Sequence, residues 1–211
     1  MHQAFHLKLA VYTSTQNTSP SSHKMIETLG RSLAGQQEPF HSDSKKPRGA
    51  VAVLFMERAD DLWLLMIKRR ENPRDPWSGQ MAFPGGHADP EDRTLLDTAA
   101  REASEEVGIN IRNQSYLGCL HNVQPKNIPM VIAPFLLLLS EEVHPTTSRE
   151  AMEGLWVPMS FLLNPKSVSS FRVPVGRREI SMGCYIYLNH LIWGMSFRII
   201  QEIISIITRA A

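Results

Sequence analysis

Cysteine is scarce in this sequence. Only Cys119 and Cys184 are present, and they do not form a C-x-x-C pair. A disulfide framework and a cysteine-based zinc site are therefore not indicated. Two cysteines are compatible with a reducing compartment, so the cytoplasm is the predicted location.

Excess charge and long apolar runs are also lacking. Lysine plus arginine total 22 and aspartate plus glutamate 21, for a formal net charge of +1. This balance does not suggest a nucleic-acid or membrane-surface partner. The most apolar stretch, residues 128–139, is interrupted by Pro129 and Pro134 and is too short to span a membrane.

The N-terminus lacks the charged start, apolar block and cleavage site of a signal peptide. It is rich in serine and threonine and has no acidic residue before Glu27. These two features faintly resemble an organellar transit segment, so an organellar matrix is kept as the alternative location.

The chain has 211 residues, of which 43% are hydrophobic, enough for one domain with a substantial core. Residues 1–47 are predicted to be an extension, made of a short helix over 22–33 and a polar linker. Residues 48–211 are predicted to form the main domain.

The main domain shows strand signals with a helix pattern in the middle and another at the end. Strands are predicted at 49–55, 62–67, 80–83, 116–123, 128–139 and 168–187, with a polar turn over 57–61. The final apolar helix, over 194–208, is expected to cover the sheet, although it could also pack against a partner in a homodimer. This order of elements predicts an α+β sandwich.

The most informative stretch runs over residues 83–109. Pro84-Gly85-Gly86 cannot be regular helix, and Gly108 is a typical helix stop. The pattern between them predicts a helix over 94–107. Glu102 and Glu106 are four residues apart and therefore share one face of that helix.

Like charges at this spacing repel, so the glutamates cost local stability unless a cation neutralises them. Mg²⁺ suits this task because it takes oxygen ligands, typically one or two carboxylates plus phosphates and water. From the helix alone, the alternative is a solvated acidic face balanced by Arg101.

The glycine loop and the helix together resemble the Nudix box of the Nudix hydrolases. The second half of that box, R-E-U-x-E-E-x-G-U, where U is an aliphatic residue, is matched by Arg101, Glu102, Ala103, Glu105, Glu106, Gly108 and Ile109. Gly86 and Asp92 have the family's glycine-to-acid spacing, with Asp in place of Glu. The gap from Asp92 to Arg101 is one residue longer than in the common box. The resemblance implies the family's α-β-α sandwich.

The segment before the box resembles the coenzyme A diphosphatase branch of the family. The matching positions are Leu64, Leu65, Arg69, Arg74, Gly79 and the Phe83-Pro84-Gly85-Gly86 run. That branch also has the longer gap, whereas Met66 and Arg70 depart from its pattern. The resemblance implies that Arg69, Arg74, Gly85 and Gly86 form the substrate-binding set, although the arginines could also be ordinary surface charges.

The resemblance implies a hydrolase that cleaves a diphosphate bond with Mg²⁺ or Mn²⁺. Glu102 and Glu106 would hold the metal, Glu105 would bind a second ion or act as base, and Glu150 is the other candidate base. Arg101 would orient a glutamate by ion pairing. Coenzyme A or acyl-CoA would give 3′,5′-ADP and (acyl-)4′-phosphopantetheine. The alternatives are a pyrophosphatase for ADP-ribose, dinucleotides or oxidised nucleotides, and a Nudix-fold binding module without catalysis.

Overall fold

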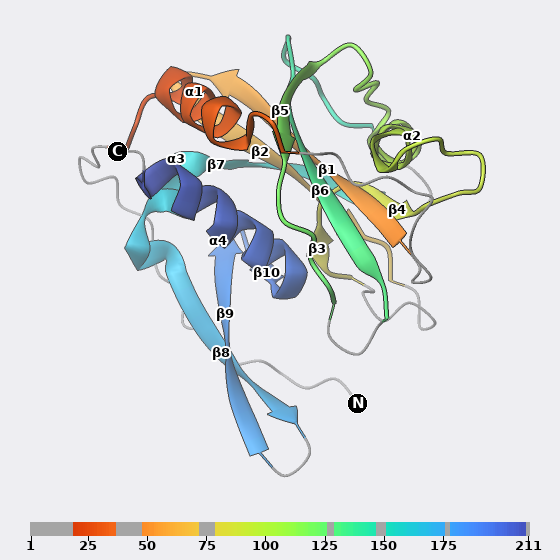
Figure 1. Cartoon of the computed structure of the whole chain (residues 1–211). Helices are drawn as coiled ribbons and strands as arrows, with labels where there is room; N and C mark the ends of the chain where they lie inside the picture. The colour runs from red at the N-terminus through yellow and green to blue at the C-terminus, as the bar shows by residue number, and fades with distance from the viewer. Residues whose placement is uncertain are drawn as a thin grey trace.

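The computed structural model describes residues 19–36, 48–71, 79–125, 129–146, 151–175 and 178–209. Within these ranges the chain forms two sheets and four α-helices (Figure 1). None of these helices combines the length and apolar character that crossing a bilayer requires.

The larger sheet is mixed, with seven strands in the order β3-β2-β1-β6-β5, while β4 pairs with β1 and β7 with β2. The strands are β1 (Arg48–Arg58), β2 (Asp61–Arg69), β3 (Met81–Ala82), β4 (Gly85–His87), β5 (Ser115–Cys119), β6 (Val131–Leu138) and β7 (Ala151–Pro158). β1 and β6 run parallel through the centre. Both are nearly continuous apolar runs, as expected for strands covered on both faces.

The turn between β1 and β2 is shorter than predicted. Ala59 and Asp60 have positive φ angles of 50° and 60°, as in a two-residue hairpin turn. Glu57 and Arg58 instead belong to β1 and pair with Leu62 and Asp61 of β2. The predicted turn over 57–61 is therefore wrong by two residues at its start and by one at its end.

A second, antiparallel sheet has the order β10-β9-β8. It consists of β8 (Val168–Val175), β9 (Arg178–Tyr187) and β10 (His190–Trp193). The β8–β9 hairpin projects from the body of the molecule (Figure 1). The strands predicted within 168–187 are thus confirmed over 168–175 and 178–187, but they belong to a separate sheet.

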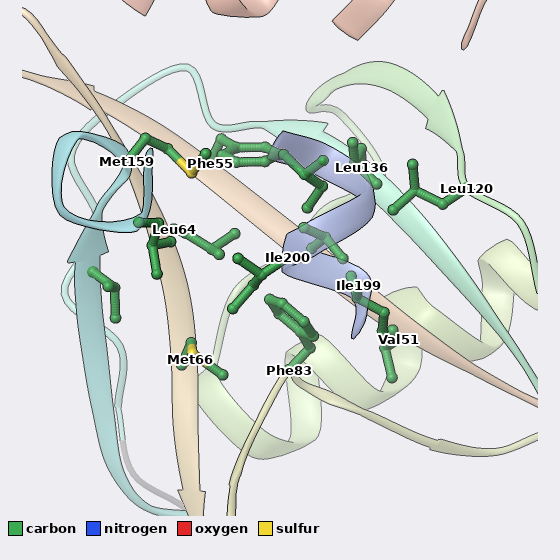
Figure 2. Packing of buried hydrophobic residues seen from close by; sticks show 14 of the residues in the cluster. Val51, Phe55, Leu64, Met66, Phe83, Leu120, Leu136, Met159, Ile199 and Ile200 are labelled. Atoms are coloured by element: carbon green, nitrogen blue, oxygen red, sulfur yellow. The ribbon is translucent and has the colours of Figure 1, made fainter. Parts of the chain in front are cut away.

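The helices cover both faces of the larger sheet. They are α1 (Ser22–Leu33), α2 (Leu95–Val107), α3 (Met159–Leu163) and α4 (Gly194–Arg209). Alternate residues of β1 point to opposite faces: Val53 packs in the cluster under α1 and α4, and Ala52 packs in the cluster under α2. Figure 2 shows the first cluster, where Ile199 and Ile200 of α4 lie near Phe83. The α-β-α sandwich is confirmed.

The predicted N-terminal helix is confirmed as α1. The Ser21 side chain accepts a hydrogen bond from the Lys24 amide, and Met25 and Leu29 are fully buried. These side chains belong to the core cluster beneath α4. The domain boundary after residue 47 stays a prediction.

The final helix is also confirmed, and its side chains are buried to different degrees. Ile199 is fully buried, whereas Phe197 and Ile204 are only half-buried. α4 therefore covers the sheet, as expected. The homodimer stays a prediction.

Candidate active site

Helix α2 has well-defined ends. The Thr94 hydroxyl accepts a hydrogen bond from the Asp97 amide at 3.1 Å, and the Asp97 carboxylate accepts one from the Thr94 amide at 3.1 Å, which completes a capping box. Gly108 ends the helix in the left-handed conformation with φ 71°. The two ends fix the position of every carboxylate between them.

The three glutamates of α2 do not share one environment. Glu102 and Glu106 are 9% and 2% exposed, because residues four apart both face the sheet. The Glu105 side chain is 60% exposed. A solvated acidic face is therefore wrong for Glu102 and Glu106 and right for Glu105.

The glycine loop packs directly on both buried carboxylates. The Gly85 amide donates a hydrogen bond of 2.8 Å to Glu106 Oε2. A Cβ atom added at Gly86 would lie 2.4 Å from Glu102 Oε1, closer than any real side chain approaches. The loop thus needs glycine at residue 86 because the Glu102 carboxylate occupies the space of a side chain there.

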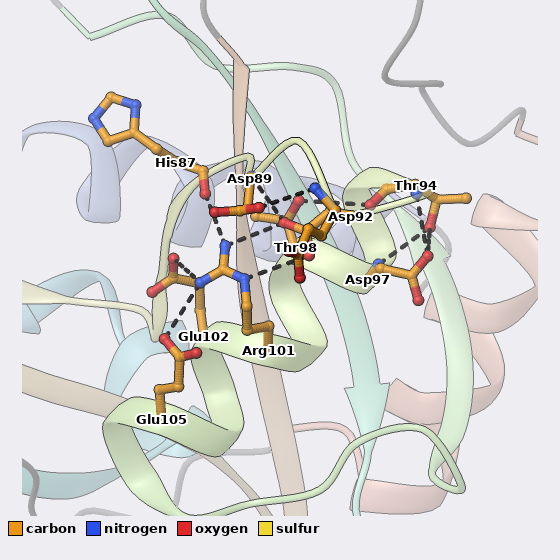
Figure 3. Close-up of polar contacts among 10 residues, drawn as sticks. His87, Asp89, Asp92, Thr94, Asp97, Thr98, Arg101, Glu102 and Glu105 are labelled. Carbon is orange, nitrogen blue, oxygen red and sulfur yellow. Dashed lines mark hydrogen bonds and ion pairs between the residues drawn. The ribbon is translucent and has the colours of Figure 1, made fainter.

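Arg101 connects the loop, the helix and the glutamates (Figure 3). Its Nη1 lies 2.8 Å from Glu102 Oε1 and 3.3 Å from Glu105 Oε2. Its Nη2 donates to the His87 carbonyl oxygen at 2.9 Å and to Asp92 Oδ2 at 3.1 Å. The contacts with His87 and Asp92 fix the guanidinium, and its Nη1 can therefore orient the carboxylates of α2.

Asp92 is the partner whose role sequence reasoning missed. Its side chain is only 7% exposed, and it accepts hydrogen bonds from Arg101 and from the Asp89 amide (Figure 3). Burial acts to raise the pKa of Asp92, but hydrogen bonds from Arg101, the Asp89 amide and Thr98 hold that pKa below the ordinary value of an aspartate. The family spacing from Gly86 was the only sequence signal that pointed to this residue.

Replacing Asp92 by asparagine should lower the free energy of unfolding by about 1–2 kcal/mol at pH 7, because Arg101 loses a charged hydrogen-bond partner. Folding depresses the pKa of Asp92, so its stabilisation is present above the unfolded pKa and is lost as pH falls through the folded pKa. The difference between D92N and the parent should therefore shrink below about pH 4. Urea unfolding at pH 7 and pH 3 measures it, with D89N on the exposed part of the loop as control. A difference that stays constant with pH would contradict the assignment.

The substrate-binding arginines of the predicted site are only partly described. Arg69 ends β2, and its Nη1 lies 3.7 Å from Glu106 Oε1, which brings this residue to the glutamates. Arg74 and Glu150 lie outside the described ranges, so the structure does not place them. Their roles stay predictions.

Open space adjoins the exposed side of α2. A shallow hollow of about 290 Å³ is lined by Ala100, Arg101, Ser104, Glu105, Asn110 and Arg112. Arg112 is held there by an ion pair of 2.9 Å with Asp97. The hollow places positive charge beside the exposed Glu105 carboxylate.

Whether these residues suit a divalent metal depends on the carboxylates. Among the side chains that the structure describes, no group of three or more His, Cys, Asp or Glu is arranged to hold an ion. Glu102 and Glu106 supply two buried carboxylates against one loop. Mg²⁺ commonly takes one or two protein carboxylates and completes its shell with water and substrate phosphates. The donor set therefore fits a hard divalent ion that shares its coordination with substrate.

Comparisons with known proteins agree with this chemistry. The family profile of the NUDIX domain matches residues 45–177. A protein of Photorhabdus laumondii described as uncharacterized Nudix hydrolase NudL is 34% identical over 141 residues, which cover 66% of this chain and 74% of the relative. A protein of Yersinia enterocolitica with the same description is 28% identical over 193 residues, which cover 90% of this chain and 96% of the relative.

A solved structure shows the same fold. The crystal structure of a MutT/nudix family protein from Enterococcus faecalis matches 92% of this chain and 75% of its own, with a TM-score of 0.53 and 18% sequence identity. At this identity the likeness supports the fold alone. The match extends well beyond the box, since it covers 92% of this chain.

Proposed function

Because this chain belongs to the Nudix hydrolase family, we propose that it hydrolyses the diphosphate bond of coenzyme A or acyl-CoA. The products are 3′,5′-ADP and 4′-phosphopantetheine or its acyl form. The observation that carries the proposal is the pair of buried glutamates held by the glycine loop, with Arg69 at 3.7 Å from Glu106. Carboxylates for a metal and an arginine for phosphate thus adjoin each other.

The preference for coenzyme A rests on the basic end of β2. Lys68, Arg69 and Arg70 follow one another there, in the segment that resembles the coenzyme A branch. Coenzyme A carries a 3′-phosphate besides its diphosphate, so additional positive charge would strengthen its binding. The planar guanidinium of arginine suits phosphate oxygens. Met66 departs from the branch pattern, but it is fully buried in the core cluster beneath α4, so the departure changes packing rather than a substrate contact.

In the proposed mechanism Glu102 and Glu106 hold the metal. Mg²⁺ or Mn²⁺, when held there, would offset charge on the phosphate oxygens and lower the pKa of an attacking water. Arg101 keeps Glu102 and Glu105 in place through its own contacts with Asp92 and the His87 carbonyl. Water adds to one phosphorus atom, and the bridging oxygen leaves with the other phosphate.

A carboxylate removes the proton of the attacking water, and Glu105 is the first candidate among the described residues. Its side chain is 60% exposed, so the proton can pass to solvent, and Arg101 Nη1 lies 3.3 Å from its Oε2. Glu150 remains the other candidate base. Glu105 can serve instead as ligand to a second ion.

The test is product analysis with a panel of substrates. The protein with Mg²⁺ or Mn²⁺ is incubated with coenzyme A, acyl-CoA, ADP-ribose, a diadenosine polyphosphate and an oxidised nucleotide, with a chelator as control. We expect coenzyme A to yield 3′,5′-ADP. The kcat/KM for coenzyme A or acyl-CoA should exceed that for every other compound in the panel. Clear activity on ADP-ribose or another compound without cleavage of coenzyme A would overturn the substrate. No metal-dependent cleavage of any compound would favour the binding module.

A further inference from the structure

Arg69 has a fixed backbone and a side chain at the edge of the site. Its amide donates to the Gln80 carbonyl at 3.0 Å, and its other neighbour in the sheet is Ala151 of β7. The register between β2 and β7 shifts between Lys68 and Arg69. The Arg69 side chain is 23% exposed, so it contacts both the buried carboxylate and solvent.

Glu106 presents its two oxygens to different partners. Oε2 accepts the Gly85 amide at 2.8 Å, and Oε1 faces Arg69 Nη1 at 3.7 Å. The Glu106 side chain is only 2% exposed, and a buried carboxylate is costly unless hydrogen bonds or positive charge compensate it. A divalent ion that binds through Oε1 meets the guanidinium, and two cations at one oxygen repel each other strongly where solvent screening is weak.

We propose that Arg69 and the divalent metal ion compete for Glu106 Oε1, and that the displaced guanidinium then binds a phosphate oxygen of the substrate. Metal binding thereby prepares the phosphate site. Binding of the two ligands is cooperative, and by linkage the cooperativity is reciprocal. The second part of this proposal, the binding of Arg69 to a substrate phosphate, rests on the proposed function. The competition concerns the protein and the metal alone.

Arg101 does not undergo the same exchange. It is fixed by Asp92 Oδ2 and by the His87 carbonyl oxygen, and neither contact involves the glutamates. Although Arg101 Nη1 also lies 2.8 Å from Glu102 Oε1, we expect these two contacts to hold Arg101 in place when a metal ion binds beside Glu102. The two arginines therefore divide their tasks: Arg101 positions carboxylates, and Arg69 moves between carboxylate and phosphate.

The competition is tested by Mn²⁺ titration without substrate, with the electron paramagnetic resonance signal of free Mn²⁺ as readout. R69Q should bind Mn²⁺ about fivefold or more tightly than the parent, a typical size for coupling between sites. R70Q removes the same charge from the exposed neighbouring residue and should stay within about twofold, since surface charges are screened. In chelator, R69Q should melt below the parent, and Mn²⁺ should raise its Tm by more.

Equal or weaker Mn²⁺ binding by R69Q would overturn the competition, as would an equal gain in R69Q and R70Q. If R69Q does not fold, R69K replaces it. That variant keeps the charge on a different head group, and it should stay within about threefold of the parent because the competing cation is retained. Tighter binding than this by R69K would count against the proposal.

The second part of the proposal is tested with adenosine 5′-(α,β-methylene)diphosphate, which cannot be hydrolysed at its bridge. Mn²⁺ should raise its affinity at least about tenfold in the parent and clearly less in R69Q. Equal coupling in both proteins would overturn the movement of Arg69 to phosphate. If the Mn²⁺ competition holds but no diphosphate is cleaved in the substrate panel, the proposed function fails and the competition stands.

Discussion

Replacing Glu106 by glutamine should lower kcat/KM by about a thousandfold or more, because a metal-assisted hydrolysis loses the charge that holds its ion. The amide oxygen of glutamine can still accept the Gly85 hydrogen bond that now ends on Glu106 Oε2. The side chain keeps its size, so the buried space stays filled. Rates on the best substrate of the panel, together with circular dichroism melts, measure both effects.

One exposed glutamate serves as the control for this variant, and a second exposed glutamate tests a different role. Glu91 lies on the loop before α2, and E91Q should keep the parent rate. Glu105 lies beside Arg101, and E105Q tests the candidate base on a side chain that is 60% exposed and whose loss creates no buried defect. E106Q with a near-parental rate on every active substrate would remove Glu106 from the metal site.

The local elements of the fold could be predicted because their signals are local. The limits of α2 follow from Thr94 at one end and Gly108 at the other, and both are visible in the sequence. The parallel pairing of β1 with β6 and the separation of β8–β10 into a second sheet could not be predicted in this way. Partners in a sheet are chosen by packing between segments far apart in the chain, which no short window contains.

In the candidate site, too, features with a local sequence signal could be predicted, whereas contacts between distant segments could not. The spacing of Glu102 and Glu106 placed them on one face, but a carboxylate pair fits a solvated face as well as a metal site. Their burial depends on the glycine loop, which supplies the Gly85 amide and leaves room for the Glu102 carboxylate at Gly86. Arg69 of strand β2 reaches Glu106 of helix α2, and that contact follows from tertiary structure alone.

Alanine at Gly85 should mainly destabilise the fold. A Cβ atom there would lie 2.3 Å from the Ala50 carbonyl oxygen and 2.7 Å from Val51 Cα, which are backbone atoms of β1. The central strand cannot move without disturbing both of its neighbours. We expect G85A to lose about 3 kcal/mol of unfolding free energy or more, at the upper end of the cost of overpacking, as measured in urea.

Alanine at Gly86 should mainly damage catalysis. Its Cβ atom would lie 2.4 Å from Glu102 Oε1, the end of a side chain that can swing away. The carboxylate then loses its contact of 2.8 Å with Arg101 and its place beside Glu106. We expect a stability loss of only about 1 kcal/mol, as for one lost hydrogen bond. The rate should nevertheless fall about a hundredfold, because displacement of about 1 Å at a reacting site has that cost.

The contrast between the two variants tests how the loop works. G30A is the matched control, because Gly30 lies within α1 with nothing within 4 Å of an added Cβ, and alanine there should stabilise the protein by up to about 1 kcal/mol. A G86A protein that unfolds like G85A would mean that Glu102 is locked by its surroundings. A G86A protein with the parental rate and Mn²⁺ affinity would mean that the position of Glu102 does not matter for the reaction. Only a folded, slow G86A beside an unstable G85A fits a loop in which one glycine supports the sheet and the other leaves room for the carboxylate.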